Sequence, residues 1–305
     1  MDFASIILTI AGLTLFEIVS SVDNAIINAQ VLSTMGAKAR AWFLFWGLLF
    51  AVVVVRGLLP WLIVFVSSPA LGPLGALTAT FSNDPAIHEI IERSAPILMI
   101  GGGIFLVFLF LHWLFLEDKD YGLPTERFFH EQGVWFFAIV SVVLATVVWA
   151  ALKIDPFMAF GAVVGSSAFF IVHGFKENAE AQEKKLIGGH LSDLSKIFYL
   201  EIIDATFSID GVLGAFAFTL SVPLILLGNG IGAVVLRQVT MGNIERIKKY
   251  VFLKNGAMYS IFVLGLVMLA SAFGVHVPAW LSPLATFGIV GYFFLQSRNH
   301  CPAAA

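Results

Sequence analysis

The chain has 305 residues, of which 59% are hydrophobic and only 12% are charged. Soluble domains carry roughly 25% charged residues, so this composition excludes an ordinary soluble protein and predicts that lipid covers most of its outside. The formal net charge is −3, and the sequence has no basic stripe that could neutralise nucleic-acid phosphates. A single cysteine, Cys301, excludes a disulfide framework and a site built from several thiolates.

Runs of about 20 mainly apolar residues, the length that crosses a bilayer as a helix, recur along the whole chain. The first run follows an amino terminus without the basic segment of a cleavable signal, so we expect it to remain as a transmembrane helix. The runs also lack the alternation that a membrane β-barrel requires. The sequence therefore predicts an all-α, polytopic bundle forming one domain over 1–305, with nine spans near 4–32, 41–66, 95–116, 134–152, 156–173, 197–220, 222–240, 256–274 and 280–296.

Lysine and arginine positions between these spans predict the orientation of the chain. With the amino terminus outside, only Arg93 and Lys153 fall on the outer side and Arg56 lies within the second span, while all other basic residues fall inside. The predicted location is therefore the cell membrane (inner or plasma membrane), with multiple passes and a cytoplasmic carboxyl terminus.

Five carboxylates lie inside the predicted spans, namely those of Glu17, Asp23, Glu201, Asp204 and Asp210. A carboxylate at the bilayer centre costs at least about 2.5–3.5 kcal/mol on insertion scales, so each one requires a reason. The segments 16–25 and 203–212 share one pattern. Each has an acid, a serine four residues later, then a β-branched residue, then aspartate.

The first and sixth spans cross the membrane in opposite directions, so the two copies of the pattern predict an inverted-topology repeat with a site near mid-membrane. Repeat A covers approximately 4–116 and repeat B approximately 197–274, with extra helices near 134–173 and 280–296. Two facing half-sites would present four carboxylates and the hydroxyls of Ser21 and Ser208 to one small volume. We expect Asp23 and Asp210 to share one ion.

Helical spacing adds detail to the first copy. Glu17, Ser21, Asn24 and Asn28 form one polar stripe, whereas Asp23 lies about 120° away from Glu17. We therefore expect an interrupted helix, with Ser20-Ser21 and Gly211 as the sites of a break. Arg56 lies about as deep as Glu17, where it could neutralise that carboxylate, with snorkelling to the headgroups as the alternative.

The two acidic segments, Phe-Glu-x-x-x-Ser-Val-Asp-Asn-Ala and Glu-x-x-Asp-Ala-x-Phe-Ser-x-Asp, resemble those of the TerC family of integral membrane proteins, in a branch described as a domain of unknown function. The resemblance covers roughly residues 5 to 296. It implies export of manganese or related divalent cations and a grouping with lysine-exporter-like transporters that use inverted three-helix repeats. The family's acidic positions fall on Glu17, Asp23, Asn24, Glu201, Asp204 and Asp210.

The leading interpretation is a transporter, not an enzyme, that carries a divalent metal ion as its substrate and needs no organic cofactor. Oxygen-only ligands suit Mn²⁺, Ca²⁺ or Mg²⁺. Export of a small organic cation and a non-transporting membrane scaffold of a metal or tellurite stress system remain alternatives, and the oligomeric state is open. The acidic loop 117–131 lies outside the motifs, and it is either a solvated connector or a metal sensor. Gly101-Gly102-Gly103 predicts close helix contact.

Overall fold

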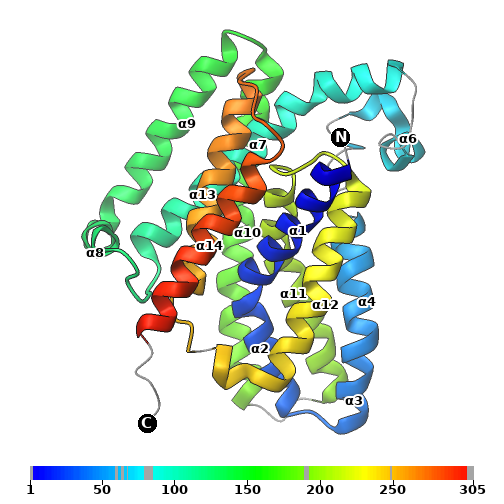
Figure 1. Ribbon diagram of the computed structural model, residues 1–305, viewed down its shortest axis with the longest axis vertical. Helices are drawn as coiled ribbons and strands as arrows, with labels where there is room; N and C mark the ends of the chain where they lie inside the picture. The colour runs from blue at the N-terminus through cyan, green and yellow to red at the C-terminus, as the bar shows by residue number, and fades with distance from the viewer. Residues whose placement is uncertain are drawn as a thin grey trace.

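A computed structural model describes residues 3–58, 61–62, 65–66, 68–78, 85–188, 192–247 and 249–300 (Figure 1). Within these ranges all regular structure is helical, which confirms the predicted all-α bundle. The first half contains α1 Phe3–Ser20, α2 Val22–Ser33, α3 Ala37–Trp42, η1 Phe43–Gly47, α4 Leu48–Phe50, η2 Ala51–Leu58, η3 Pro69–Leu71, α6 Gly72–Thr78, α7 Pro85–Leu116 and α8 Pro124–Glu131. The second half contains η5 Gly133–Trp135, α9 Phe136–Leu152, α10 Pro156–Gly188, α11 Asp193–Ala215, α12 Val222–Ile247, α13 Leu253–Ala272 and α14 Leu281–His300.

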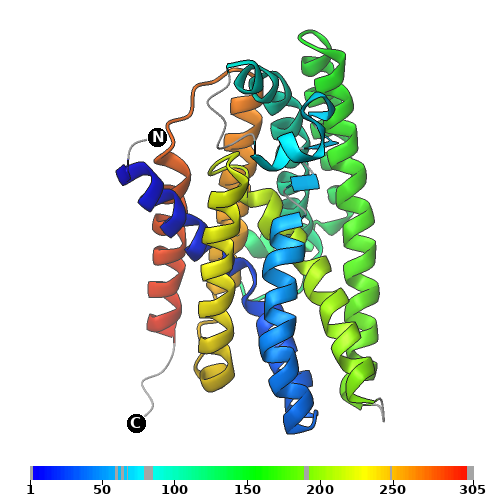
Figure 2. The same ribbon diagram turned by 90° about the vertical axis from the view of Figure 1, so that its right-hand side faces the viewer.

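Seven helical segments in the described residues are long and apolar enough to cross a membrane: Phe3–Ser20, Ala37–Val54, Arg93–Leu116, Gly133–Leu152, Pro156–Phe175, Val222–Val239 and Leu253–Ala272. The predicted sixth and ninth spans are present as α11 and α14 but are not among the seven. Charged residues interrupt the apolar character of α11, and α14 ends in the polar sequence Gln296-Ser297-Arg298-Asn299. Both helices nevertheless lie within the bundle, beside α1 (Figures 1 and 2).

The predicted second span has an unusual backbone. Two π-helical segments, η1 and η2, flank the short α4 between Ala37 and Leu58. A π-helix bonds each amide one residue further back than an α-helix, and short π segments are frequent at functional sites. This segment lies beside α12 in both views (Figures 1 and 2).

Glycines bring the central helices α7, α10 and α13 into close contact. A methyl group on Gly101 would lie 2.9 Å from the carbonyl oxygen of Gly161, and one on Gly103 would lie 3.1 Å from the carbonyl oxygen of Gly265. The expected role of the 101–103 glycines in helix contact is therefore confirmed. The glycine-containing α10 and α12 are continuous helices, and a small residue at a helix interface lets two backbones approach.

Candidate functional site

The first motif lies at a break between two helices. α1 ends at Ser20 and α2 begins at Val22, with Ser21 between them at φ −102° and ψ 5°. Ser21 Oγ donates a 2.8 Å hydrogen bond to Glu17 Oε1, and Ser20 Oγ donates to the carbonyl oxygen of Glu17 at 3.4 Å. The break expected at Ser20-Ser21 is therefore confirmed, and it places a hydroxyl donor directly on the carboxylate.

Glu17 is the most deeply buried carboxylate of the first motif that the structure describes, at 1% exposure. Two glycines of other helices make room for it. A methyl group on Gly211 of α11 would lie 3.0 Å from Glu17 Oε2, and one on Gly232 of α12 would lie 2.7 Å from Glu17 Cβ. The Glu17 carboxylate therefore lies against α11 at the residue that follows Asp210.

The second motif lies on an unbroken helix. α11 runs from Asp193 to Ala215 through Gly211, so the second expected break is wrong. Gly211 serves close contact instead, because its missing side chain lets Glu17 approach the α11 backbone. Asp204 and Asp210 are buried at 6% and 8% exposure. Ser208 Oγ donates to the backbone carbonyl of Asp204 at 2.7 Å, whereas the equivalent Ser21 donates to a carboxylate.

The α1–α2 segment and α11 run antiparallel, as the opposite directions of the two motifs require. As the residue number rises along the α1–α2 segment, the number of the contacted residue in the segment containing α11 falls. The contacts are Gly12 with Phe218, Phe16 with Gly214, Glu17 with Gly211, Thr34 with Lys196, and Gly36 with Asp193.

Equivalent positions before the two motifs contact neighbouring segments. A methyl group on Gly232 would lie 2.8 Å from the carbonyl oxygen of Thr14, and Gly47, at the end of η1, contacts Glu201 Oε1. Aligning the two motifs makes Thr14 the equivalent of Glu201. In each case a glycine of the neighbouring segment lies against the residue at this position, at a backbone oxygen in α1 and at a side-chain oxygen in α11.

Glu201 lies apart from Glu17 because it faces the 37–58 segment. Its Oε1 is buried without a hydrogen-bond partner, and Arg237 of α12 lies within electrostatic range. The Arg237 guanidinium donates to the carbonyl oxygen of Phe43 at 3.3 Å and lies 4.9 Å from the centre of that ring. Glu201 therefore belongs to a second polar position, beside η1 and Arg237.

The structure does not place every predicted site residue. The side chains of Asp23, Asn24 and Arg56 lie outside the described residues, so the expected Asp23–Asp210 pair and the Arg56–Glu17 pair are not described. Among the side chains that are described, no three of His, Cys, Asp and Glu gather around one point. Asn28 is buried at 6% exposure, and its Oδ1 has no hydrogen-bond partner.

One polar residue near Glu17 escaped the sequence analysis. Asn229 of α12 is 0% exposed, and neither Nδ2 nor Oδ1 has a hydrogen-bond partner. The signal in the sequence is an amide placed between two glycines, Gly228-Asn229-Gly230, in the middle of an apolar span. Asn229 lies outside both acidic segments, so the repeated pattern does not point to it.

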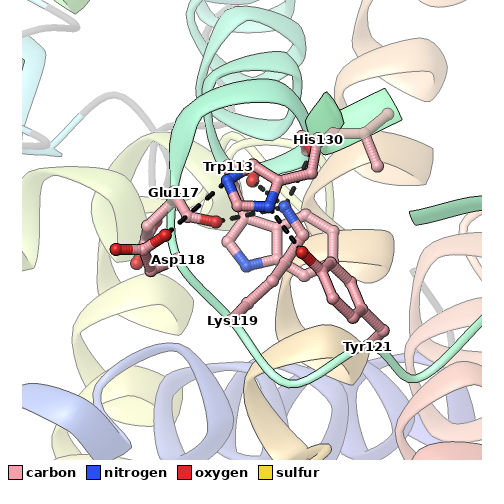
Figure 3. Close-up of polar contacts among 7 residues, drawn as sticks. Trp113, Glu117, Asp118, Lys119, Tyr121 and His130 are labelled. Atoms are coloured by element: carbon pink, nitrogen blue, oxygen red, sulfur yellow. Dashed lines mark hydrogen bonds and ion pairs between the residues drawn. The ribbon is translucent and has the colours of Figure 1, made fainter. Parts of the chain in front are cut away.

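The acidic loop after α7 is held to the folded structure by side-chain contacts, while the Asp118 side chain is fully exposed. Lys119 Nζ donates to the carbonyl oxygens of Trp113, Leu114 and Glu117, two of them at 2.8 and 3.3 Å, and lies 4.6 Å from the Trp113 ring centre. Burial lowers the pKa of Lys119 to about 8. Tyr121 and His130 form a hydrogen bond at 2.6 Å on the other side of this loop (Figure 3).

Residues from α13 and α14 complete this arrangement, which we call the inner latch and define as residues 117–126 with Lys254, Asn255 and Gln296. Lys254 pairs with Glu117, and Gln296 Nε2 donates to the carbonyl oxygen of Gly122 at 2.5 Å. Asn255 Nδ2 donates 2.8 Å to Glu126 Oε2, which also accepts from the Gly122 amide at 2.8 Å. Glu126 is fully buried. These contacts give the loop a structural role in tying three helices together.

Comparison with known proteins identifies a family without a characterised activity. A family model described as "Protein of unknown function (DUF475)" matches residues 22–301, which is nearly the whole chain and includes α2 and α11. No curated protein and no solved structure matches the chain. Because this match covers nearly the whole chain, the chain belongs to the DUF475 family of proteins of unknown function.

Proposed function

We propose that this protein is a membrane transporter of a divalent metal cation, with Mn²⁺ as the first ion to test. The observation that carries the proposal is the position of the Glu17 carboxylate. It is buried among apolar helices, accepts a hydrogen bond from Ser21 at a helix break, and lies against Gly211 beside Asp210 of an antiparallel helix.

The chemistry of this position favours a cation. Carboxylates, hydroxyls and amides supply only oxygen ligands, which suit hard divalent ions such as Mn²⁺, Mg²⁺ and Ca²⁺. Burying a charge without compensation is costly, and ionisable residues inside membrane helices usually mark an ion pathway. Discontinuous helices near mid-membrane, at the interface of two inverted repeats, are a recurring way of building such sites in transporters.

Several finer parts of the proposal rest on the sequence. Export as the direction and membership of a TerC-like superfamily rest on the resemblance of the two acidic motifs. A cell-membrane location with the amino terminus outside rests on the distribution of lysine and arginine. The proposed ligands are Glu17, Asp23 and Asp210. Asp204, which is the equivalent of Glu17 in the second motif, and Glu201, one turn before it in α11, are also proposed.

The test is cation flux into liposomes that contain the purified protein. We expect Mn²⁺ to cross faster than in protein-free liposomes, and we expect Glu17→Gln and Asp210→Asn to remove most of this flux because each deletes a charge at nearly constant size. Glu126→Gln is the matched control, since it neutralises a buried carboxylate in the inner latch, and it should retain flux.

Two results would contradict the proposal. A wild-type protein that moves none of Mn²⁺, Ca²⁺ and Mg²⁺ and is not stabilised by them would favour a membrane scaffold. Flux of an amino-acid cation without flux of metal would favour an organic-cation exporter. Full retention of Mn²⁺ flux by well-folded Glu17→Gln and Asp210→Asn would leave the carboxylates as packing residues only.

A further inference from the structure

Asn229 stands out among the polar residues of α12. Its side chain is completely buried, and neither heteroatom of its amide has a hydrogen-bond partner among the residues that the structure describes. Buried polar groups are almost always hydrogen-bonded. Leaving a donor and an acceptor unsatisfied costs the full desolvation of both, so an asparagine in this position destabilises the protein unless something else binds it.

The contacts of the two glycines that flank Asn229, Gly228 and Gly230, fix its position. A methyl group on Gly228 would lie 2.5 Å from Leu13 Cβ, and one on Gly230 would lie 3.2 Å from Val52 Cγ1. Asn229 therefore lies between the side of α12 that contacts α1 and the side that contacts η2. Thr14 Oγ1 donates to the carbonyl oxygen of Gly228 at 3.2 Å, which holds α1 and α12 together at this level.

Glu17 lies against the same helix, one turn from Asn229. Residues three apart are neighbours on a helix surface, so Asn229 is adjacent to Gly232. Gly232 in turn contacts Glu17, because a methyl group added to Gly232 would lie 2.7 Å from Glu17 Cβ and 2.8 Å from Glu17 Cγ. A buried amide oxygen and a buried carboxylate thus share one region between α1, α12 and α11.

A partly hydrated cation satisfies both ends of this amide. Asparagine oxygen is a neutral ligand for hard divalent ions, and a water molecule bound to the ion can accept a hydrogen bond from Nδ2. We propose that Asn229 is a ligand of the membrane-interior cation site and supplies its neutral oxygen. This inference rests on the proposed function, because it assigns a further residue to the same site.

The test exploits the cost of an unsatisfied amide. Asn229→Leu replaces it with an apolar side chain of similar size, so the metal-free protein should melt at the same or a higher temperature than wild type. Its apparent Kd for Mn²⁺, measured by the rise in melting temperature with MnCl₂, should increase at least tenfold. Asn229→Asp keeps an oxygen ligand and should retain the response to MnCl₂.

Thr9→Val is the matched control. The Thr9 hydroxyl on α1 is also buried without a hydrogen-bond partner, but it lies eight residues before Glu17, about 12 Å along the helix. This variant should respond to MnCl₂ as wild type does. If Asn229→Leu does not fold, Asn229→Ala, which removes the same amide without adding a branched side chain, serves in its place.

The outcomes separate this inference from the function on which it rests. A wild-type response to MnCl₂ that survives unchanged in Asn229→Leu overturns the role of Asn229 and leaves the transporter proposal standing. A metal-free Asn229→Leu protein that melts far below wild type, with an unchanged Kd, shows that the amide is a packing residue and also overturns it. Absence of any response in wild type contradicts the proposed function itself.

Discussion

At the residue scale, the hydrogen bond from Ser21 to Glu17 is the most informative contact in the site. It joins two residues four apart across the end of α1, and both are buried. Hydrogen bonds to charged groups contribute more than neutral ones, because a buried carboxylate without a donor keeps its desolvation cost. Ser21 therefore stabilises the site even before an ion binds.

We expect Ser21→Ala to lower the stability of the protein by about 1–3 kcal/mol and to weaken Mn²⁺ binding, since the carboxylate loses the donor that orients it. Thermal melting with and without MnCl₂ measures both effects. Ser141→Ala is the control, because Ser141 Oγ donates to the carbonyl oxygen of Phe137 on the exposed surface of α9. Equal melting curves for the two variants would contradict a special role for Ser21.

Sequence spacing predicted part of this residue pattern correctly. The polar stripe containing Glu17 and Ser21 follows from helical periodicity alone, and the structure places both on one face. Ser208 holds the equivalent position in the second motif, but its hydroxyl bonds the backbone carbonyl of Asp204 one turn back. A serine inside a continuous helix has that carbonyl within reach. Ser21 lies at a helix break, and its hydroxyl bonds the Glu17 carboxylate instead.

At the scale of elements, close contact between α1 and α12 depends on the absence of a side chain at Gly232. An alanine there would bring its methyl group to 2.8 Å from the carbonyl oxygen of Thr14, which cannot move without shifting α1. We expect Gly232→Ala to destabilise the protein by about 1–3 kcal/mol and to abolish Mn²⁺ flux by displacing Glu17.

Gly288→Ala on α14 is the matched control, because no atom lies within 4 Å of the added methyl group. Alanine is a better helix former than glycine, so this variant should be as stable as wild type or more stable by about 0.5–1 kcal/mol. Thermal melting and Mn²⁺ flux into liposomes, measured on both variants, test whether stability and transport depend on the close contact between α1 and α12. A stable, active Gly232→Ala protein would show that α1 and α12 do not need their close approach.

The inner latch predicts a pH dependence of stability. Burial lowers the pKa of Lys119 to about 8 in the folded protein, against 10.5 in the unfolded chain. Between these values the unfolded chain holds a proton that the folded protein has released, so stability rises with pH. We expect the melting temperature of wild type, relative to that of Lys119→Gln, to rise as the pH increases from 7.5 to 9.5. Parallel curves would show that Lys119 remains charged and hydrated.

Break points along the helices could be predicted only where local chemistry sets them. Ser20-Ser21 breaks α1 from α2 as expected, because adjacent hydroxyls offer alternative partners to the backbone. Gly211 was expected to break α11 by its flexibility, but tertiary contact with Glu17 uses its small size instead. Sequence alone does not reveal which of these two properties of a glycine a fold will use.

At the scale of the whole molecule, the described chain begins in the upper half at α1 and ends in the lower half at α14 (Figure 1). Apolar runs predicted the positions of the seven described segments that are long and apolar enough to cross a membrane, and of α11 and α14, because length and hydropathy are local properties. The structure interrupts the first run at Ser21 and the second run with π-helical segments. The contacts that bring residues 12–36 against 193–218 are long-range, and only the repeated motif gave a hint of them.

The single cysteine offers a direct test of orientation. Cys301 follows α14 and should lie in the cytoplasm, so a membrane-impermeant maleimide should label it only after cells are permeabilised. In a Cys301→Ala protein, Ile154→Cys places a thiol in the exposed turn between α9 and α10, which should lie outside and react in intact cells. Reversed labelling of the two positions would invert the proposed topology.

The inner latch has a consequence for biosynthesis. Its loop leaves the ribosome early, but Lys254 and Gln296 come from the last part of the chain. At roughly 5–20 residues per second, the interval between synthesis of Glu126 and of Gln296 is about 10–30 s. During that time α7 has no closing partner at its end, and Glu126 and Lys119 stay hydrated. The inner latch therefore cannot form until α13 and α14 have been synthesised. A chain truncated before α13 would lack these contacts, and we expect cellular proteases to degrade it faster than the full chain.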